Sequence, residues 1–152
     1  MHPKSKKLHL LLPLFIIGVL LLAACSAETP SQSEPGVPDA GVVDVQYTLK
    51  TASEGGRYWF IGVGGDIDGQ VNPDLQASVG DTVAITLVND DGRSHDVVIT
   101  EFGAATSIFG RSGQEETVVF TADQAGTFFY FCSVGGHRQA GMEGQFIVVA
   151  GE

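Results

Sequence analysis

The most constraining feature of the sequence is a series of short, strand-like segments that begins at Val42. These segments are rich in Val, Ile, Thr, Phe and Tyr, and turns containing Gly, Asn or Asp separate them. The predicted strands are Val42–Leu49, Arg57–Val63, Leu75–Val79, Thr82–Val88, His95–Thr100, Glu115–Thr121, Gly126–Phe131 and Gly144–Val149. No stretch of the sequence shows a capped apolar stripe of helical period. About eight short strands predict an all-β fold, a Greek-key β-sandwich.

The first 24 residues have the composition of an export signal. Three lysines precede a largely apolar run, Leu8–Leu22, which is shorter than the span of about 20 residues that crosses a membrane comfortably. The run ends in Leu22-Ala23-Ala24-Cys25, which resembles the lipobox of bacterial lipoproteins, where cleavage precedes a lipidated cysteine. Residues 1–24 are therefore predicted to be a lipoprotein signal peptide, and Cys25 the lipidated residue. The alternatives are an ordinary signal peptide with an incidental cysteine, or an uncleaved anchor helix.

Residues 25–41 are predicted to be a flexible tether that carries one folded domain, residues 42–152. The tether is rich in Ser, Pro and acids and has too little apolar surface to fold. Three of the 8 basic residues and none of the 18 acidic ones lie in the signal, so the mature chain has 5 against 18, a formal charge of −13. This charge argues against a nucleic-acid partner and against direct binding to anionic lipid. Its simplest meaning is solubility, and docking to a basic redox partner is a second interpretation.

Side chains that suit a soft metal are few in the predicted domain. The chain has 4 histidines, 2 cysteines and 2 methionines, and the signal and the anchor account for half of each. The residues that remain are His95, Cys132, His137 and Met142. Three of them form the pattern C-x4-H-x4-M in one loop between two predicted strands. His95 follows a turn at the start of another strand, from which it can approach the same point.

Two imidazoles, one thiolate and a weak thioether form the ligand set of copper electron-transfer sites. Zinc would accept the first three, but a thioether suits Cu(I) better. A dinuclear copper centre needs two loop cysteines and a disulfide needs a partner thiol, whereas the predicted domain has one cysteine. Taken singly, each residue has a plain structural explanation, such as an inert buried thiol for Cys132. Their joint spacing favours a site for one copper ion.

The loop pattern, together with a histidine on an earlier strand, resembles the cupredoxin family, and auracyanin, rusticyanin and sulfocyanin within it. The likeness covers most of residues 42–149. It implies a type 1 (blue) copper with His95, Cys132 and His137 as equatorial ligands and Met142 as the axial ligand. It also implies that His137 is a partly exposed electron port. Small and apolar residues would surround this port: Val134, Gly135, Gly136 and Ala140.

One position departs from the family pattern. Many cupredoxins place Asn or Ser directly after the first histidine, where the side chain ties the two ligand loops together. This chain has Asp96 there. The hydrogen bonding around the ligands, and with it the reduction potential, is left open by the sequence.

Two stretches, Tyr58–Gly62 and Glu101–Thr106, also resemble domains of copper nitrite reductases and multicopper oxidases. Those enzymes hold a second copper through histidines that flank the type 1 cysteine. Here the flanking residues are Phe131 and Ser133. We therefore expect an electron carrier and not an enzyme.

The sequence thus predicts an exported copper protein, anchored to the outer face of the cell membrane or facing the periplasm. The expected partners are a redox donor and a redox acceptor, with the membrane bound through the lipid anchor, and the chain is expected to be monomeric. Copper storage or delivery is the alternative function, and a structural or adhesive sandwich is a third. A calcium loop at Asp66 and Asp68 is less favoured than a plain turn, because no downstream carboxylate follows as in an EF-hand.

Overall fold

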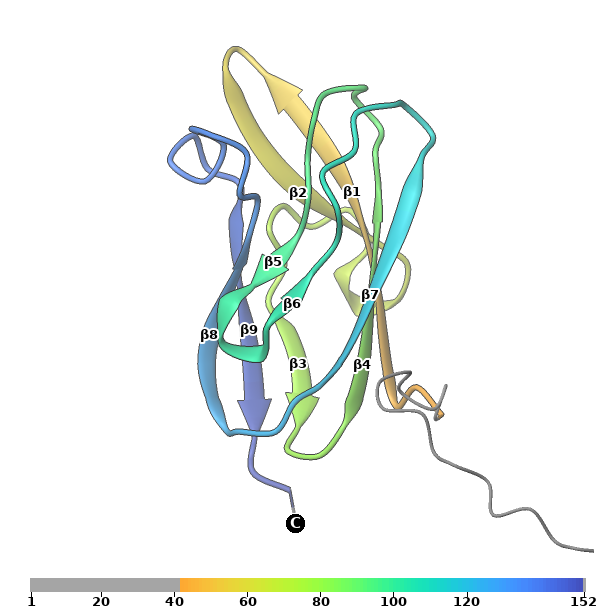
Figure 1. Ribbon diagram of the computed structural model, residues 1–152, viewed down its shortest axis with the longest axis vertical. Helices are drawn as coiled ribbons and strands as arrows, with labels where there is room; N and C mark the ends of the chain where they lie inside the picture. The colour runs from red at the N-terminus through yellow and green to blue at the C-terminus, as the bar shows by residue number, and fades with distance from the viewer. Residues whose placement is uncertain (1–41, 152) are drawn as a thin grey trace, which may run out of the picture. The chain divides into compact units, whose positions relative to one another are not determined.

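Two packed β-sheets make up the part of the chain that the computed structural model describes, residues 42–151 (Figure 1). The predicted signal peptide, Cys25 and the whole predicted tether lie outside the described residues. The sheet orders are β2-β1-β4-β7 and β3-β9-β8-β5-β6. The strands are β1 Val45–Glu54, β2 Arg57–Val63, β3 Leu75–Ser78, β4 Thr82–Val88, β5 Val98–Ile99, β6 Ala104–Ala105, β7 Glu115–Thr121, β8 Gly126–Phe131 and β9 Glu143–Val149. The predicted all-β sandwich is confirmed.

The strands β2, β4, β7 and β8 have the predicted bounds, whereas β1 differs at both ends. It starts at Val45 and runs on through Glu54, past the predicted end at Leu49. The added residues are mostly polar, and they are held by antiparallel pairing with the start of β2. Gly55 and Gly56 make the turn with φ of 57° and 80°, which suits a two-residue hairpin and which a side chain would strain. The result is a long β1–β2 hairpin.

Most of the segment His95–Thr100, which was predicted to be a strand, does not pair with a neighbouring strand. Only Val98 and Ile99 form β5, and His95 makes an isolated bridge, in which its amide and that of Phe109 each donate to the other's carbonyl at 3.0 Å. The short β6 pairs with β5 and was not predicted. Strands of two residues are too short to show an alternating apolar pattern in the sequence. Their pairing depends on neighbouring segments.

Fully buried side chains from both sheets meet between them. The largest are Tyr130, Phe60, Phe146, Leu49, Leu75, Ile85 and Leu87. The Tyr130 hydroxyl donates to the Pro73 carbonyl at 2.7 Å, which satisfies a polar atom deep in the core. Gly144 faces Tyr130 on the neighbouring strand, and a Cβ there would lie 2.3 Å from the tyrosine hydroxyl. This close packing supports the strands from which the ligand loop departs.

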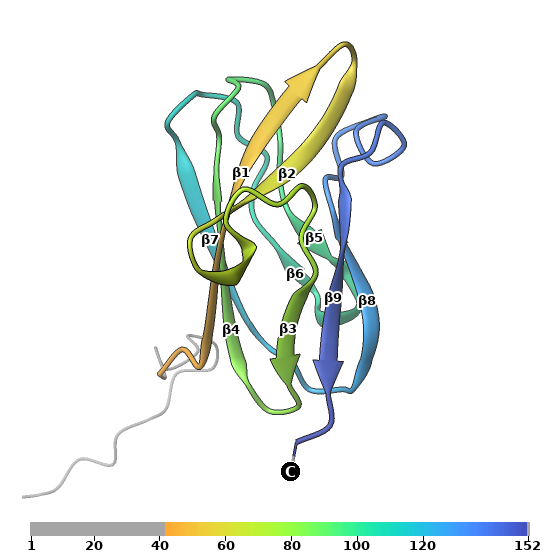
Figure 2. The same cartoon turned by 180° about the vertical axis from the view of Figure 1, so that it is seen from behind.

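The loops that carry the predicted ligands lie at one end of the sandwich. The β1–β2 hairpin and the β4–β5 and β8–β9 connections all reach this end, whereas β1 begins and β9 finishes at the other (Figures 1 and 2). Within residues 42–151 we find no helix with the length and apolar character needed to cross a membrane.

Candidate metal centre

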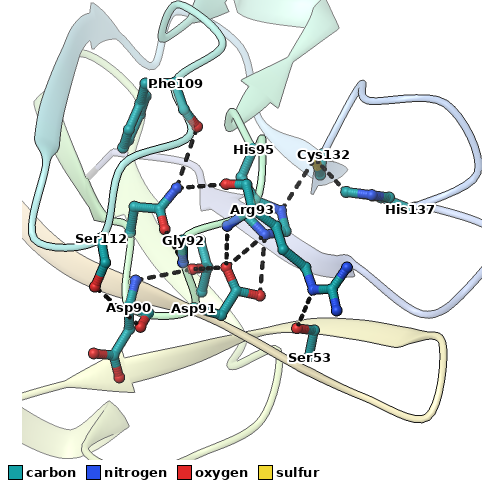
Figure 3. Close-up of polar contacts among 12 residues, drawn as sticks. Ser53, Asp90, Asp91, Gly92, Arg93, His95, Phe109, Ser112, Cys132 and His137 are labelled. Atoms are coloured by element: carbon teal, nitrogen blue, oxygen red, sulfur yellow. Dashed lines mark hydrogen bonds and ion pairs between the residues drawn. The ribbon is translucent and has the colours of Figure 1, made fainter.

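Three of the four predicted ligands bring their donor atoms together in a buried cluster (Figure 3). His95 lies in the β4–β5 connection, Cys132 directly follows β8, and His137 lies in the turn beyond it. The Cys132 Sγ is 3.8 Å from His95 Nδ1 and 3.5 Å from His137 Nδ1. The three donor atoms lie within 4.8 Å of one another. The tertiary fold thus joins a histidine to a cysteine 37 residues away.

Backbone hydrogen bonds fold the ligand loop back on itself. The Cys132 amide donates to the Met142 carbonyl at 3.2 Å, and the Met142 amide donates to the His137 carbonyl at 3.0 Å. Gly136 and Gly141, with φ of 87° and 109°, allow the reversals that this closure needs. These backbone bonds place Met142, the fourth predicted ligand, beside the other two loop residues, and its side chain is fully buried.

The imidazole of His95 is held from its far side by Asp91, which lies in the β4–β5 connection four residues before it. His95 Nε2 lies 3.0 and 3.2 Å from the two carboxylate oxygens of Asp91. Figure 3 shows the carboxylate on the side of the ring away from Cys132. The only sequence signal was a carboxylate four residues before a ligand histidine, which by itself is common in turns.

Asp96 links the two ligand loops by hydrogen bonds, a contact that the sequence alone left undetermined. Its Oδ1 accepts a hydrogen bond from the Ser133 amide at 2.7 Å, and its Oδ2 accepts one from the Ser133 hydroxyl. The residue is only 3 % exposed. Asp96 follows His95 and Ser133 follows Cys132, so the hydrogen bonds between Asp96 and Ser133 fix the position of His95 relative to Cys132.

His137 is covered by an aromatic ring that the sequence analysis did not place at the site. Tyr58, at the start of β2, stacks on the imidazole with a centroid distance of 3.8 Å and an interplanar angle of 16°. Its amide also donates to the Ala140 carbonyl at 3.3 Å, which joins the β1–β2 hairpin to the ligand loop. His137 is 9 % exposed, and Tyr58 adds an aromatic ring to the small and apolar residues that were expected around it.

The protonation of the three donors follows from their burial. Burial lowers the pKa of His95 below its ordinary value, although the charge of Asp91 opposes the shift. Burial also lowers the pKa of His137, and the charge of His95 adds to this effect. Burial raises the pKa of the Cys132 thiol to about 11. At neutral pH both imidazoles are thus neutral and ready to bind a metal, whereas the thiol must lose its proton as the metal enters.

The donor spacing fits one transition-metal ion. Bonds of about 2.0 Å to imidazole and about 2.3 Å to thiolate, opened by about 120° in a trigonal plane, place nitrogen and sulfur about 3.7 Å apart. The observed separations are 3.8 and 3.5 Å. Two imidazoles and one thiolate in a trigonal arrangement are the donor set of mononuclear blue-copper sites. Fold and site together define a copper-binding cupredoxin domain.

Comparison with known proteins agrees with this class. The chain belongs to the multicopper oxidase family, whose sequence model matches residues 44–152. A copper-containing nitrite reductase of Alcaligenes xylosoxydans xylosoxydans is 37 % identical over an alignment of 90 residues, and the match covers 51 % of this chain and 26 % of the enzyme. The chain thus spans about a quarter of that relative's length.

Solved structures of auracyanin B and rusticyanin share the fold. Auracyanin B superposes with a TM-score of 0.53 at 17 % identity, over 71 % of this chain and 91 % of auracyanin B. Rusticyanin from Thiobacillus ferrooxidans superposes with a TM-score of 0.53 at 24 % identity, over 68 % of this chain and 75 % of rusticyanin. At these identities the likeness shows the fold, and the ligands are argued from the residues of this chain.

Proposed function

We propose that this domain carries single electrons between redox partners through one type 1 copper ion held by His95, Cys132, His137 and Met142. The observation that carries the proposal is the buried His-Cys-His cluster with donor separations of 3.5 and 3.8 Å. When bound, copper supplies a one-electron Cu(II)/Cu(I) couple. The protein's part is to hold the donors in a geometry that serves both oxidation states.

The surroundings of the donors support a rigid site. Asp91 holds the His95 ring, the Asp96–Ser133 bonds join the two ligand loops, and Tyr58 packs on the His137 ring. Tyr58 lies in β2, and the Asp96–Ser133 bonds run from the β4–β5 connection to the β8–β9 connection, so movement of one ligand would break contacts to another part of the fold. A site with little freedom to rearrange is suited to fast electron transfer.

A carrier role is favoured over substrate reduction by the content of the described domain. Residues 42–151 contain one cluster of three or more His, Cys, Asp or Glu donors within binding distance, and it is this one. The nitrite reductase likeness covers about a quarter of that enzyme. We therefore propose a single-copper carrier and not a catalytic centre for this part of the chain.

The position of the site suits the proposed anchoring to a membrane. Strand β1 begins at the end of the sandwich opposite the ligand loops (Figures 1 and 2). A lipid at Cys25 and a tether over residues 25–41 would hold the protein at the outer face of a membrane and leave the copper end accessible to a donor and an acceptor. We propose that it works there as a monomer.

Visible absorption, EPR and voltammetry of the Cu(II)-loaded protein test the proposal. We expect an intense thiolate-to-copper band in the red, bleached by ascorbate and restored by an oxidant. Cys132→Ser should abolish this band, whereas Met142→Leu should keep it and change the potential, because the axial ligand is weak and tunes the couple. A colourless copper complex, or a band that survives Cys132→Ser, would contradict the assignment.

The alternative role, copper storage or delivery, is separated by metal exchange. A carrier must keep its ion in both oxidation states, and donors that are almost fully buried favour retention. We expect the copper to remain bound when the oxidised or the reduced protein is incubated with a chelator. Rapid loss from one state would instead support copper delivery.

A further inference from the structure

Asp91 is the carboxylate that faces a ligand ring. The His95 ring turns Nδ1 toward Cys132 and Nε2 toward Asp91. We propose, on the basis of the ligand set proposed above, that Asp91 is a positioning residue: it holds His95 for copper and supplies a negative charge that favours Cu(II) over Cu(I). The reduction potential of this site is then set in part by a residue outside the four ligands.

The carboxylate is itself held in place. Asp91 Oδ1 accepts hydrogen bonds from the Arg93 amide at 3.1 Å and from the Thr51 hydroxyl at 3.2 Å. The Arg93 guanidinium nitrogen Nε donates to Ser53, as Figure 3 shows. The Asp91 side chain is 14 % exposed and that of His95 is fully buried, so water has little access to their contact.

Hydrogen bonds from the Asn89 side chain stabilise the turn that carries Asp91. The Asn89 side-chain nitrogen donates to the Arg93 carbonyl at 2.6 Å and to the Phe109 carbonyl at 3.2 Å. Its side-chain oxygen accepts from the Gly92 amide at 2.8 Å. This fully buried amide links the turn to Phe109, which forms the β-bridge with His95. The Asp91 carboxylate and the His95 imidazole are therefore held in position by the same set of hydrogen bonds.

The chemical consequence follows from the two nitrogens of the ring. An imidazole that binds a metal through Nδ1 carries its proton on Nε2, and a carboxylate that accepts this proton's hydrogen bond fixes the tautomer and makes Nδ1 a stronger donor. A nearby negative charge also stabilises a doubly charged ion more than a singly charged one. Both effects lower the reduction potential. Asp96 differs, because both its oxygens are bonded to Ser133.

The adjacent residue offers a matched control. Asp90 carries the same charge, but its side chain is 59 % exposed and pairs with Lys50 at 3.3 Å. Asp91→Asn and Asp90→Asn remove the same charge one residue apart. Only Asp91→Asn removes a charge that contacts the His95 ring.

The test compares the two variants in the copper-loaded full chain, held in detergent. We expect both to keep the visible band. Asp91→Asn should lower Cu(II) affinity about 10- to 100-fold. Each tenfold loss specific to Cu(II) raises the potential by about 59 mV for a one-electron couple. Asp90→Asn should change neither quantity appreciably. If the two variants have equal potentials and Cu(II) affinities, the inference is overturned.

A second measurement needs no variant. In the diamagnetic Cu(I) protein, NMR should detect a His95 Nε2 proton that exchanges slowly with solvent, because Asp91 accepts its hydrogen bond. Its absence would overturn the inference even if Asp91→Asn did not fold. Failure of the proposed function looks different: the unmodified protein would then lack the visible band.

Discussion

Replacing Asp96 with alanine tests whether this carboxylate joins the two ligand loops. Its oxygens accept hydrogen bonds from the amide and the hydroxyl of Ser133, and the residue is almost fully buried. A hydrogen bond to a charged group contributes about 1.5–3 kcal/mol. Ser133 is exposed, so water replaces part of what is lost. We expect Asp96→Ala to lower the free energy of unfolding of the copper-free protein by about 2–4 kcal/mol.

Thermal unfolding followed by circular dichroism gives a direct readout. A domain of this size loses about 4 °C in Tm for each kcal/mol, so the expected decrease is about 8–16 °C. Asp96→Asn should lie between the wild type and Asp96→Ala, because neutral hydrogen bonds are about half as strong as charge-assisted ones. Asp123→Ala, a change at an exposed acid in the turn before β8, is the control and should change Tm little.

A double-mutant cycle with Ser133→Ala isolates the contact. If the two side chains are bonded as the structure shows, their effects on the free energy of unfolding will not add, and the coupling will exceed about 0.5 kcal/mol. Additive effects, or an Asp96→Ala protein as stable as Asp123→Ala, would refute the reasoning that this pair holds the loops together.

Three further changes test the core and the protonation of the site. Tyr130→Phe should cost about 1–3 kcal/mol of stability in chemical denaturation, because the buried Pro73 carbonyl loses its donor at 2.7 Å; an unchanged midpoint would contradict this. Gly144→Ala should cost about 3 kcal/mol or more, because its Cβ would lie 2.3 Å from the Tyr130 hydroxyl inside a packed core; a wild-type melting curve would show that the ring can move aside. The pKa of Cys132 rises from 9.0 in the unfolded chain to about 11 in the fold. Its contribution, about 3 kcal/mol, is fully present below pH 9 and is lost as the pH rises toward 11. Denaturation of the copper-free protein across this range should therefore show a loss that Cys132→Ser lacks, and identical pH profiles would count against it.

Much of the fold is predictable from the sequence because its signals are local. The strands β2, β4, β7 and β8 have the predicted bounds, since each is a β-favouring run of six or seven residues with turn residues near its ends. The two-residue strands β5 and β6 were misjudged or missed. Their pairing exists only because segments distant in sequence lie beside them.

The ligand inventory is equally local. The spacing of Cys132, His137 and Met142 in one loop, with a single further histidine in the domain, is enough to indicate a metal site. The structure brings three donors together as predicted. The role of Met142 as axial ligand stays a prediction, as do the lipidation of Cys25 and the identity of the partners.

The surroundings of the ligands were decided by tertiary structure alone. Tyr58 stacks on a histidine 79 positions away because the β1–β2 hairpin and the ligand loop share one end of the sandwich. Asp96 reaches Ser133 across 37 positions. Asp91 is close to His95 in sequence, yet its orientation depends on Thr51 in β1. A sequence determines which donors a chain possesses, whereas the packing of distant segments determines which charges and rings face those donors, and these contacts tune the site.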